Sequence, residues 1–509
     1  MDRISLPIFS CLKKKGRCNM QKKQSRLLIV SLLIVLFAYF IIQVIGKTMN
    51  KDVSDTNLQI ASNDLDGEIA DSYIEPGWQK TKTFTIQNNG KTERKYNIVI
   101  KDLMNTFVTK GYLKYKVTST NNGYNMTEFK DIPKSSAPKD TILAYSASIP
   151  VGVTQSYTIE FKYANDGSVD QSDDMGKKLS GTLFITEGTE EPVTLLSQLL
   201  ADKSTRPGER TDFSTVYTSN NTKTLYTGTE NGTTVYYFAG NATDNWVKFG
   251  KNESNQDLYW RIIRTNSDGS VRLLYHGTST TATDTYIGTS GFHGYIGDIA
   301  YLSYMYGSLG SISNARTNQT NSSRIKTTID NWYKDNLNTN YGKYLSTTAV
   351  YCNDRSISDN TDFGAYTRLI TNKTPTYDCA TTEDKFTVDT STGNGKLTYP
   401  IALMTADEVS FAGGVWLTRA ETWYYKNSAN GSSTGETNWL LLSPFACYES
   451  RPRVFSVDGS SSPGLLGNYD VISTHGVRPA ISLKSCTLYS TGDGSASDPY
   501  TIKETETGC

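Results

Sequence analysis

The sequence predicts a multidomain protein with an N-terminal transmembrane helix, an all-β sandwich and a larger α+β domain. Three observations predict this class: one uncharged apolar segment near the N-terminus, period-two alternation of apolar residues over 58–187, and mixed strand and helix patterns over 213–509. A length of 509 residues suits two to four domains. Charged residues make up 20% and apolar residues 37%, which excludes a coiled coil and a highly charged disordered chain.

The first predicted element is a membrane-spanning helix at residues 27–46. Its apolar segment begins at Leu27 and ends at Ile45, and only Ser31 and Gln43 within it are polar. A helix of this length crosses a hydrocarbon core of roughly 30 Å, so the lipid bilayer is an expected partner. A cleaved signal peptide is the alternative, but its apolar core is shorter, roughly 7 to 15 residues.

Charge gives the orientation of this helix. The whole chain has a formal net charge of zero, yet its first 26 residues are strongly basic. The positive-inside rule therefore predicts that residues 1–26 are cytoplasmic and that the bulk of this single-pass cell-membrane protein is extracellular. A nucleic-acid partner is not expected, because the chain as a whole has no excess of basic residues.

A polar spacer at 47–57 leads to an expected immunoglobulin-like β-sandwich at 58–187. Tyr157, Ile159, Phe161 and Tyr163 alternate with polar residues, so one face of this strand is expected to be buried. Turn signals such as Asn121-Asn122-Gly123 separate the segments. Six or seven short strands of this kind are typical of a sandwich that serves as a spacer or binding module.

Residues 188–212 form an expected linker with one short helix. Leu195, Leu196, Leu199 and Leu200 lie at helical spacing, and Pro207-Gly208 ends the pattern.

Residues 213–509 combine strand, helix and turn signals in one expected α+β domain. The segments 259–264 and 270–275 flank Asn-Ser-Asp-Gly, which predicts a hairpin. Apolar residues between Ile325 and Leu337 lie at helical spacing after Ser323, a residue that can cap a helix. Thr405 and Glu408 form a capping box for a second helix that ends near Gly413.

Several motifs in this domain resemble a known group. They are Tyr351-Cys-Asn-Asp-Arg355, Ala402-Leu-Met-Thr-Ala-Asp-Glu-Val409, Asn438-Trp-Leu-Leu-Leu-Ser-Pro444, Gly476-Val-Arg-Pro-Ala-Ile-Ser-Leu-Lys484 and Gly492-Asp-Gly-Ser-Ala-Ser-Asp-Pro-Tyr500. Over residues 193–509 the chain resembles the C-type-lectin-like surface domain of Firmicutes and Mollicutes proteins, whose fold is related to that of the formylglycine-generating enzyme. The resemblance implies a fold more than an activity. The region 58–187 is similar to sandwich modules of the same proteins.

The resemblance also implies a disulfide between Cys352 and Cys379, because similar proteins have cysteines at these places. Free thiols are the alternative. Five cysteines follow the predicted helix, where an oxidising environment preserves disulfides. The pairing of Cys447, Cys486 and Cys509 stays open.

Two groups of residues are candidates for ligand binding. Trp423, Tyr424 and Tyr425 precede a polar loop, and aromatic faces can stack on sugars or anchor a protein partner; a core position in a strand is the alternative. The second group lies in an expected irregular stretch at 446–474, the part that resembles the variable face of lectin-like receptor-binding proteins. Its members are Arg451, Arg453, Asn468 and Tyr469. Arg478 is expected to hold the final strand by a buried ion pair or backbone contacts.

Known catalytic and metal motifs do not occur. There is no Gly-x-Ser-x-Gly elbow, no Walker A motif, no EF-hand and no zinc spacing, so neither a metal, a cofactor nor a catalytic residue is predicted. The expected function is a cell-surface adhesin, not an enzyme, whose head recognises carbohydrate or protein. The alternatives are an extracellular hydrolase or modifying enzyme on the formylglycine-generating-type fold, and a structural envelope protein.

Overall fold

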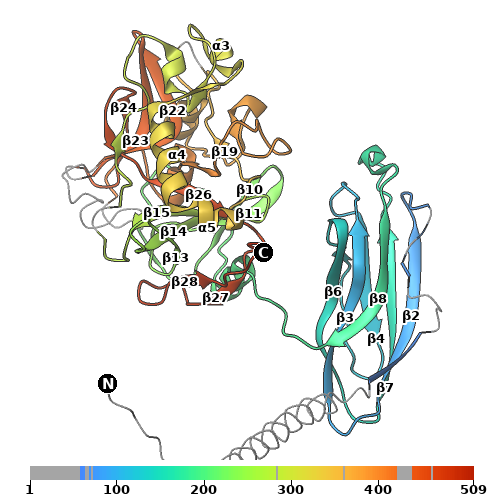
Figure 1. The fold of residues 1–509 in the computed structure, drawn as a ribbon. Coiled ribbons are helices and arrows are strands. Elements are labelled where there is room, and N and C mark those ends of the chain that lie inside the picture. Colours follow the sequence, from blue (N-terminus) through green and yellow to red (C-terminus); the bar gives the residue numbers. More distant parts are fainter. Residues whose placement is uncertain are drawn as a thin grey trace, which may run out of the picture. The chain divides into compact units, whose positions relative to one another are not determined.

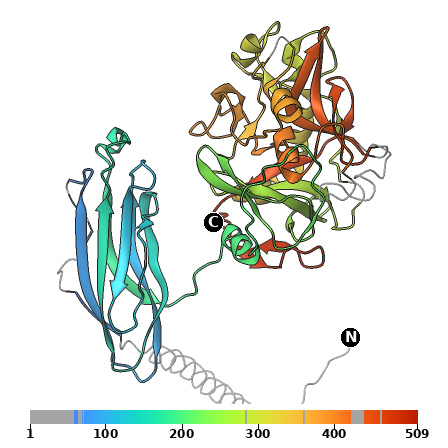
Figure 2. The same cartoon turned by 180° about the vertical axis from the view of Figure 1, so that it is seen from behind.

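The computed structural model describes residues 58–62, 68–69, 71, 73–282, 285–358, 361–420, 438–459 and 462–509. The chain divides into two compact units, Met1–Glu191 and Pro192–Cys509, shown from two sides in Figures 1 and 2. The predicted cytoplasmic segment 1–26, transmembrane helix 27–46 and spacer 47–57 lie outside the described residues. Among the helices that are described, none is long and apolar enough to span a bilayer.

The first unit consists of two antiparallel sheets (Figure 1). The larger sheet has the order β1 (Leu58–Ser62), β2 (Gln79–Asn88), β7 (Thr154–Tyr163), β4 (Leu113–Ser119) and β5 (Lys130–Asp131). The smaller sheet has the order β6 (Ser135–Ile149), β3 (Arg94–Asn105) and β8 (Leu179–Glu187), and one 3-10 turn, η2 (Ser172–Asp174), precedes β8.

One hydrophobic core joins the two sheets. The alternation predicted for β7 is confirmed, because Tyr157, Ile159, Phe161 and Tyr163 are each at most 2% exposed. Their partners in the core include residues of β3 in the other sheet, such as Ile98. A sheet buried on one face by a second sheet needs this period-two pattern, since successive side chains point to opposite faces.

The second unit contains two main sheets with helices packed beside them. The nine-stranded sheet has β21 (Ile401–Leu403), β26 (Pro479–Leu483), β15 (Val271–Gly277), β14 (Asp257–Thr265), β13 (Trp246–Lys251), β28 (Tyr500–Ile502) and β27 (Tyr489–Thr491) in order, with β10 (Tyr226–Glu230) and β11 (Thr233–Tyr237) branching from β14. The five-stranded sheet has the order β16 (Thr289–Ser290), β25 (His475–Gly476), β22 (Trp439–Tyr448), β23 (Arg451–Val457) and β24 (Leu466–Asp470).

Short strands and helices complete this unit. The strand pairs are β9 (Asn220–Asn221) with β12 (Asn241–Ala242), β17 (Met305–Tyr306) with β18 (Asn321–Ser322), and β19 (Tyr351–Cys352) with β20 (Lys385–Phe386). The helices are α2 (Leu195–Asp202), α3 (Ile312–Arg316), α4 (Arg324–Asn336), α5 (Asn338–Tyr341), α6 (Gly364–Tyr366) and α7 (Ala406–Ala412). The 3-10 segments are η3 (Ile299–Leu302), η4 (Gly342–Tyr344) and η6 (Thr382–Asp384), and η5 (Thr367–Asn372) is π-helical.

The helix signals of the sequence are confirmed. Ser323 caps α4 through Lys326 N, and Thr405 and Glu408 form both hydrogen bonds of the capping box of α7. Helix α7 ends at Gly413, whose φ of 116° is a conformation that glycine adopts easily. The predicted hairpin is formed by β14 and β15.

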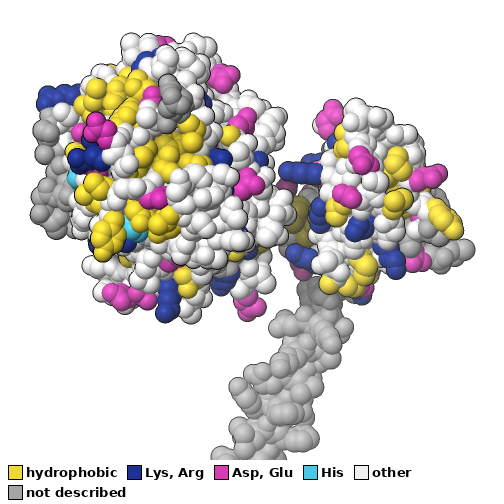
Figure 3. All heavy atoms as spheres, turned by 90° about the horizontal axis from the view of Figure 1, so that it is seen from above, with side chains coloured by type: hydrophobic (Ala, Val, Ile, Leu, Met, Phe, Trp, Pro, Cys, Tyr) yellow, Lys and Arg dark blue, Asp and Glu magenta, His cyan; other side chains and the backbone are white. Residues whose placement is uncertain are grey.

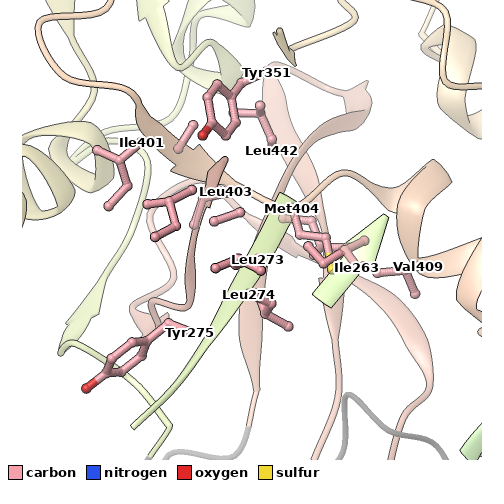
Figure 4. Close-up of a cluster of buried hydrophobic side chains, with 14 of the residues drawn as sticks. Ile263, Leu273, Leu274, Tyr275, Tyr351, Ile401, Leu403, Met404, Val409 and Leu442 are labelled. Carbon is pink, nitrogen blue, oxygen red and sulfur yellow. The ribbon is translucent and has the colours of Figure 1, made fainter. Parts of the chain in front are cut away.

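The two main sheets of the second unit share one core. Figure 4 shows Leu273 and Leu274 of β15 near Leu403 of β21, with Met404 and Val409 of the α7 region beside them. Leu442 of the five-stranded sheet belongs to the same cluster. Because both sheets bury side chains in one cluster, the five-stranded sheet is a rigid part of the unit.

The prediction that residues 446–474 form an irregular stretch is wrong, because just over half of these residues lie in β-strands. Strands β22, β23 and β24 form two consecutive antiparallel pairs across it. The residue types did not predict β24, which reads Leu-Gly-Asn-Tyr-Asp. Glycine, asparagine and aspartate are all depleted in strands. Packing against β23 stabilises β24 despite this low propensity.

Two disulfides are present. The predicted pair Cys352–Cys379 is confirmed, with Cα atoms 5.7 Å apart. Cys486 pairs with Cys509, and Cys447 is free and partly buried. Burial, and then the charge of Asp298, raise the pKa of the Cys447 thiol, which makes it a weak nucleophile at neutral pH.

Replacing Ile159 with alanine will destabilise the first unit by roughly 2–5 kcal/mol, because a fully buried side chain is removed from its core. Hydrogen exchange of the whole chain, read separately for amides of each unit, measures the effect. Glu160→Ala on the exposed face of the same strand is the matched control and should leave exchange nearly unchanged. Equal acceleration in both variants would contradict the two-sheet packing.

Candidate functional site

One face of the β22–β23–β24 sheet brings together three of the predicted binding residues. Arg451 pairs with Tyr448 across β22 and β23, and Arg453 pairs with Asp470 across β23 and β24. Asn468 lies two residues before Asp470 and so faces the same side. We call the surface formed by Tyr448, Arg451, Arg453, Asn468 and Asp470 the hairpin face.

Asp470 connects the two arginines of the hairpin face. Its Oδ2 accepts a hydrogen bond from Arg451 Nη2, and its Oδ1 accepts one from Arg453 Nε at 2.8 Å. Arg453 also donates through Nη1 to Asn468 Oδ1 at 3.2 Å. The carboxylate side chain is 12% exposed, whereas the arginines are 50% and 37% exposed. The guanidinium groups are therefore held in fixed positions while their outer edges stay open to solvent.

A tight turn supports this face. Strand β22 ends at Tyr448, and Glu449 and Ser450, with φ of 48° and 60°, connect it to Arg451. Two successive positive φ values match the twist of a two-residue hairpin turn. The carbonyl of Ser450 accepts a hydrogen bond from Gly297 N at 2.8 Å, and Tyr448 donates its hydroxyl to Asp362 at 2.7 Å.

The fourth predicted residue of this group lies on the other side of the sheet. Tyr469 pairs with Val454, accepts a hydrogen bond from Asn438 Nδ2 at 2.8 Å, and contacts the ring of His475 at 4.0 Å. It is thus separated from the arginines. Trp423, Tyr424 and Tyr425 lie outside the described residues.

Two members of the hairpin face were missed in the sequence. Tyr448 and Asp470 become neighbours of the arginines only through the register of two hairpins, which no local pattern reports. The spacing Asn468-x-Asp470 opposite Arg451-x-Arg453 is the one available signal, since period-two spacing places each pair on one face.

Exposed hydrophobic side chains also occur in this unit. In the view of Figure 3, hydrophobic side chains of several types gather on the face of the second unit that is drawn, with charged groups beside them. The large hydrophobic residues of this unit that are exposed are Val193, Tyr295, Ile296, Leu309, Ile357, Leu417, Tyr448 and Ile472. Single exposed residues are ordinary, but contiguous apolar surface is a feature of binding sites.

A second concentration of charge is buried. Glu408 accepts hydrogen bonds from Arg264 at 2.9 Å and from Arg272 at 2.7 Å, and Arg264 also pairs with Glu230 at 2.9 Å. Burial raises the pKa of Glu408, but Arg272 and Arg264 outweigh it and lower the pKa to about 2. This carboxylate is thus ionised and fully engaged.

The same region contains a small hollow with a cavity volume of about 20 Å³. Arg368 borders it and pairs with Asp354 at 2.7 Å and with Asp407 at 2.9 Å. Cys352 of the disulfide also lines it. Since these carboxylates have arginine partners, the arrangement resembles a structural ion network more than an acid–base pair.

Arg478 has the structural contacts expected for it. Its Nε and Nη2 donate to the carbonyl of Tyr275, at 3.3 and 3.2 Å, and its guanidinium lies 4.8 Å from the ring centre of Trp439. Hydrogen bonds to the backbone and a cation–π contact of Arg478, the residue before β26, therefore connect this part of the chain to β15 and β22.

No group of three or more histidine, cysteine, aspartate or glutamate side chains suited to a metal ion occurs in the described part of the chain. No family model, curated protein or solved structure matches the chain.

Glu408→Gln will lower the free energy of unfolding of the second unit by roughly 3–5 kcal/mol, since two buried arginines lose their shared partner. Glutamine keeps the cap hydrogen bond to Thr405 N, so the change isolates the charge. Denaturant unfolding measures the loss. The matched control is Asp257→Asn, which removes an exposed pairing with Lys248 and Lys251 and should cost less than about 1 kcal/mol. A similar cost for both changes would contradict the network.

His276 gives the second unit a pH dependence. It is 2% exposed, it contacts Trp246 edge-on at 4.4 Å, and neither ring nitrogen has a hydrogen-bond partner in the described structure. Burial, then the charges of Arg261 and Arg478, hold its pKa well below 6.5. The folded state therefore keeps His276 neutral while the unfolded state binds a proton below pH 6.5. Stability falls as the pH drops below that value, by up to about 1.4 kcal/mol per pH unit.

Denaturant unfolding between about pH 7 and pH 5, where histidine titrates, tests this dependence. His276→Phe keeps a ring beside Trp246 and should remove the histidine part of the slope. An identical slope in the variant would show that other groups cause the loss.

Proposed function

We propose that this chain is a membrane-anchored bacterial surface protein whose second unit binds a ligand through the hairpin face. In this proposal the first unit is an immunoglobulin-like spacer and the second is a C-type-lectin-like head. The ligand is a carbohydrate or a protein on another surface, and the apolar segment at residues 27–46 anchors the chain in the cell membrane.

The observation that carries the proposal is the state of the two arginines. Arg451 and Arg453 are fixed by Asp470 and Asn468, yet both are at least 37% exposed. Within the described residues, Arg451 donates only through Nη2, and Arg453 only through Nε and Nη1. A guanidinium group has five N–H donors, so several on each side chain are free to bind hydroxyl, carbonyl or carboxylate oxygens of a ligand.

The surroundings of the hairpin face favour binding as well. Tyr448 is 37% exposed and supplies an aromatic ring beside Arg451, which is the kind of surface on which sugar rings and protein side chains pack. The face lies on a sheet anchored in the core, so its geometry does not depend on a long loop.

In this proposal the groups that could act in catalysis serve stability instead. Cys352 and Cys379 are joined in a disulfide, and Glu408, Asp407, Asp354 and Glu230 are all paired with arginines. We therefore assign these groups to stability, and the enzyme and structural-envelope alternatives stay predictions.

A combined glycan and protein array tests the proposed function with the full chain in detergent. We expect saturable binding to at least one class of ligand. Arg453→Lys keeps the charge but loses the planar fork, so affinity should fall at least about tenfold, or roughly 1.4 kcal/mol. Arg324→Lys, an exposed position on α4, is the matched control.

Two results would contradict the proposal. One is the absence of saturable binding to any array member. The other is equal binding by the Arg453→Lys and wild-type proteins, which would place the ligand away from the hairpin face.

A further inference from the structure

Four large hydrophobic side chains lie beside the hairpin face on the surface of the second unit. Each is at least 39% exposed, so a partner in solution can reach all of them. We call this set the apolar collar, and its members are Tyr295, Ile296, Leu309 and Ile472.

The segment that carries Tyr295 and Ile296 is attached to the hairpin face. Gly297 N donates a hydrogen bond to the carbonyl of Ser450 at 2.8 Å, which joins the segment to the turn between β22 and β23. Tyr295 N donates to Nδ1 of His293 at 3.1 Å, so the backbone on the other side of the exposed pair is fixed as well. These two side chains are therefore positioned beside the arginines before a partner arrives, which lowers the entropy cost of binding.

Leu309 and Ile472 adjoin the same segment. Gly310 N, next to Leu309, donates to Oδ2 of Asp298, the residue that directly follows the segment, at 2.7 Å. The carbonyl of Val471, next to Ile472, accepts a hydrogen bond at 3.0 Å from the backbone N–H of the histidine that begins the segment. The apolar collar and the hairpin face thus form one continuous surface.

The side chains of the apolar collar favour a protein partner over a sugar. Ile296, Leu309 and Ile472 are aliphatic, so they offer neither a flat ring on which a sugar stacks nor a hydrogen-bonding group. Covering them is favourable when the partner supplies apolar atoms, by roughly 25 cal/mol for each Å² removed from water. Apolar side chains next to tyrosine and arginine are typical of the centre of a protein interface.

The exposed charges indicate what else the partner carries. Arg451 and Arg453 are 50% and 37% exposed, whereas Asp470 between them is 12% exposed. Glu449 in the turn is the one exposed carboxylate among the described residues of the β22–β23 turn and the hairpin face, so the charge that faces solvent is mainly positive. A carboxylate complements such a surface and accepts from guanidinium N–H groups.

We infer that the apolar collar and the hairpin face together bind a protein segment in which a carboxylate lies beside apolar side chains. This inference rests on the proposed function and narrows its ligand from carbohydrate or protein to protein.

Bead-displayed libraries of short peptides, titrated with the labelled full chain in lipid nanodiscs, test the inference. Detergent is avoided because it covers exposed apolar surface. One library combines apolar residues with glutamate, a second combines apolar residues with lysine, and a third combines serine with glutamate; beads that carry neutral and acidic oligosaccharides are the remaining probe. We expect the best members of the first library to bind at least about tenfold more tightly than any other probe.

Three variants locate the binding. Ile296→Thr keeps a β-branched side chain but removes apolar surface from the collar, so affinity for the selected peptides should fall at least about fivefold. Val193→Thr makes the same kind of change at an aliphatic residue that is 43% exposed and lies outside the collar, and it should bind as the wild type does. Arg453→Lys should weaken the same peptides, because lysine lacks the planar fork.

The outcomes separate this inference from the proposed function. Oligosaccharide binding that is lost in Arg453→Lys but kept in Ile296→Thr would overturn the inference and leave the proposed function standing. Equal binding of the glutamate and lysine libraries would also overturn the inference. So would association of nanodiscs through the chain itself, seen by light scattering and lost in Ile296→Thr, because the partner would then be a second copy. Absence of any binding that depends on Arg453 would overturn both.

Discussion

The second unit depends on the carboxylate of Glu408. This side chain completes the capping box of α7 and, at the same time, binds Arg264 of β14 and Arg272 of β15. Arg264 extends the network to Glu230 at the end of β10. One buried charge thus fixes the start of a helix, two strands of the central sheet and a neighbouring hairpin. Because breaking one member leaves other charges buried without partners, the network specifies a single arrangement of these elements.

The geometry of the hairpin face depends on that arrangement indirectly, through α7 and β22. Helix α7 packs beside β22, and Leu442 of β22 lies in the same core as Leu273 and Met404. The position of β22 in turn sets the register of β23 and β24, which brings Arg453 opposite Asp470. A polar surface on a sheet keeps its geometry only when the opposite side of that sheet is well packed.

The amino-acid sequence reports local features well and distant pairings poorly. The capping box of α7, the Ser323 cap of α4 and the alternation in β7 each follow from residues a few positions apart, and all were predicted correctly. The pairing of Arg264 with Glu408 joins residues 144 positions apart, and no periodicity reports it. For the same reason the sequence identified Arg451 and Arg453 but not Asp470, and it placed Tyr469 in the same group although the sheet separates them. Strand β24 was missed because its residue types favour turns, and its packing overrides that preference.

The turn between β22 and β23 has a thermodynamic consequence. It contains only Glu449 and Ser450, and neither is glycine although both have positive φ. At positive φ, the backbone of a residue that has a Cβ can adopt only a small range of conformations. The hydrogen bond from Gly297 N to the carbonyl of Ser450 restricts the turn further. Arg451 and Tyr448 are thus held in place before any encounter. When a ligand binds them, the protein therefore loses little conformational entropy. Even a small set of hydrogen bonds can then give specific recognition.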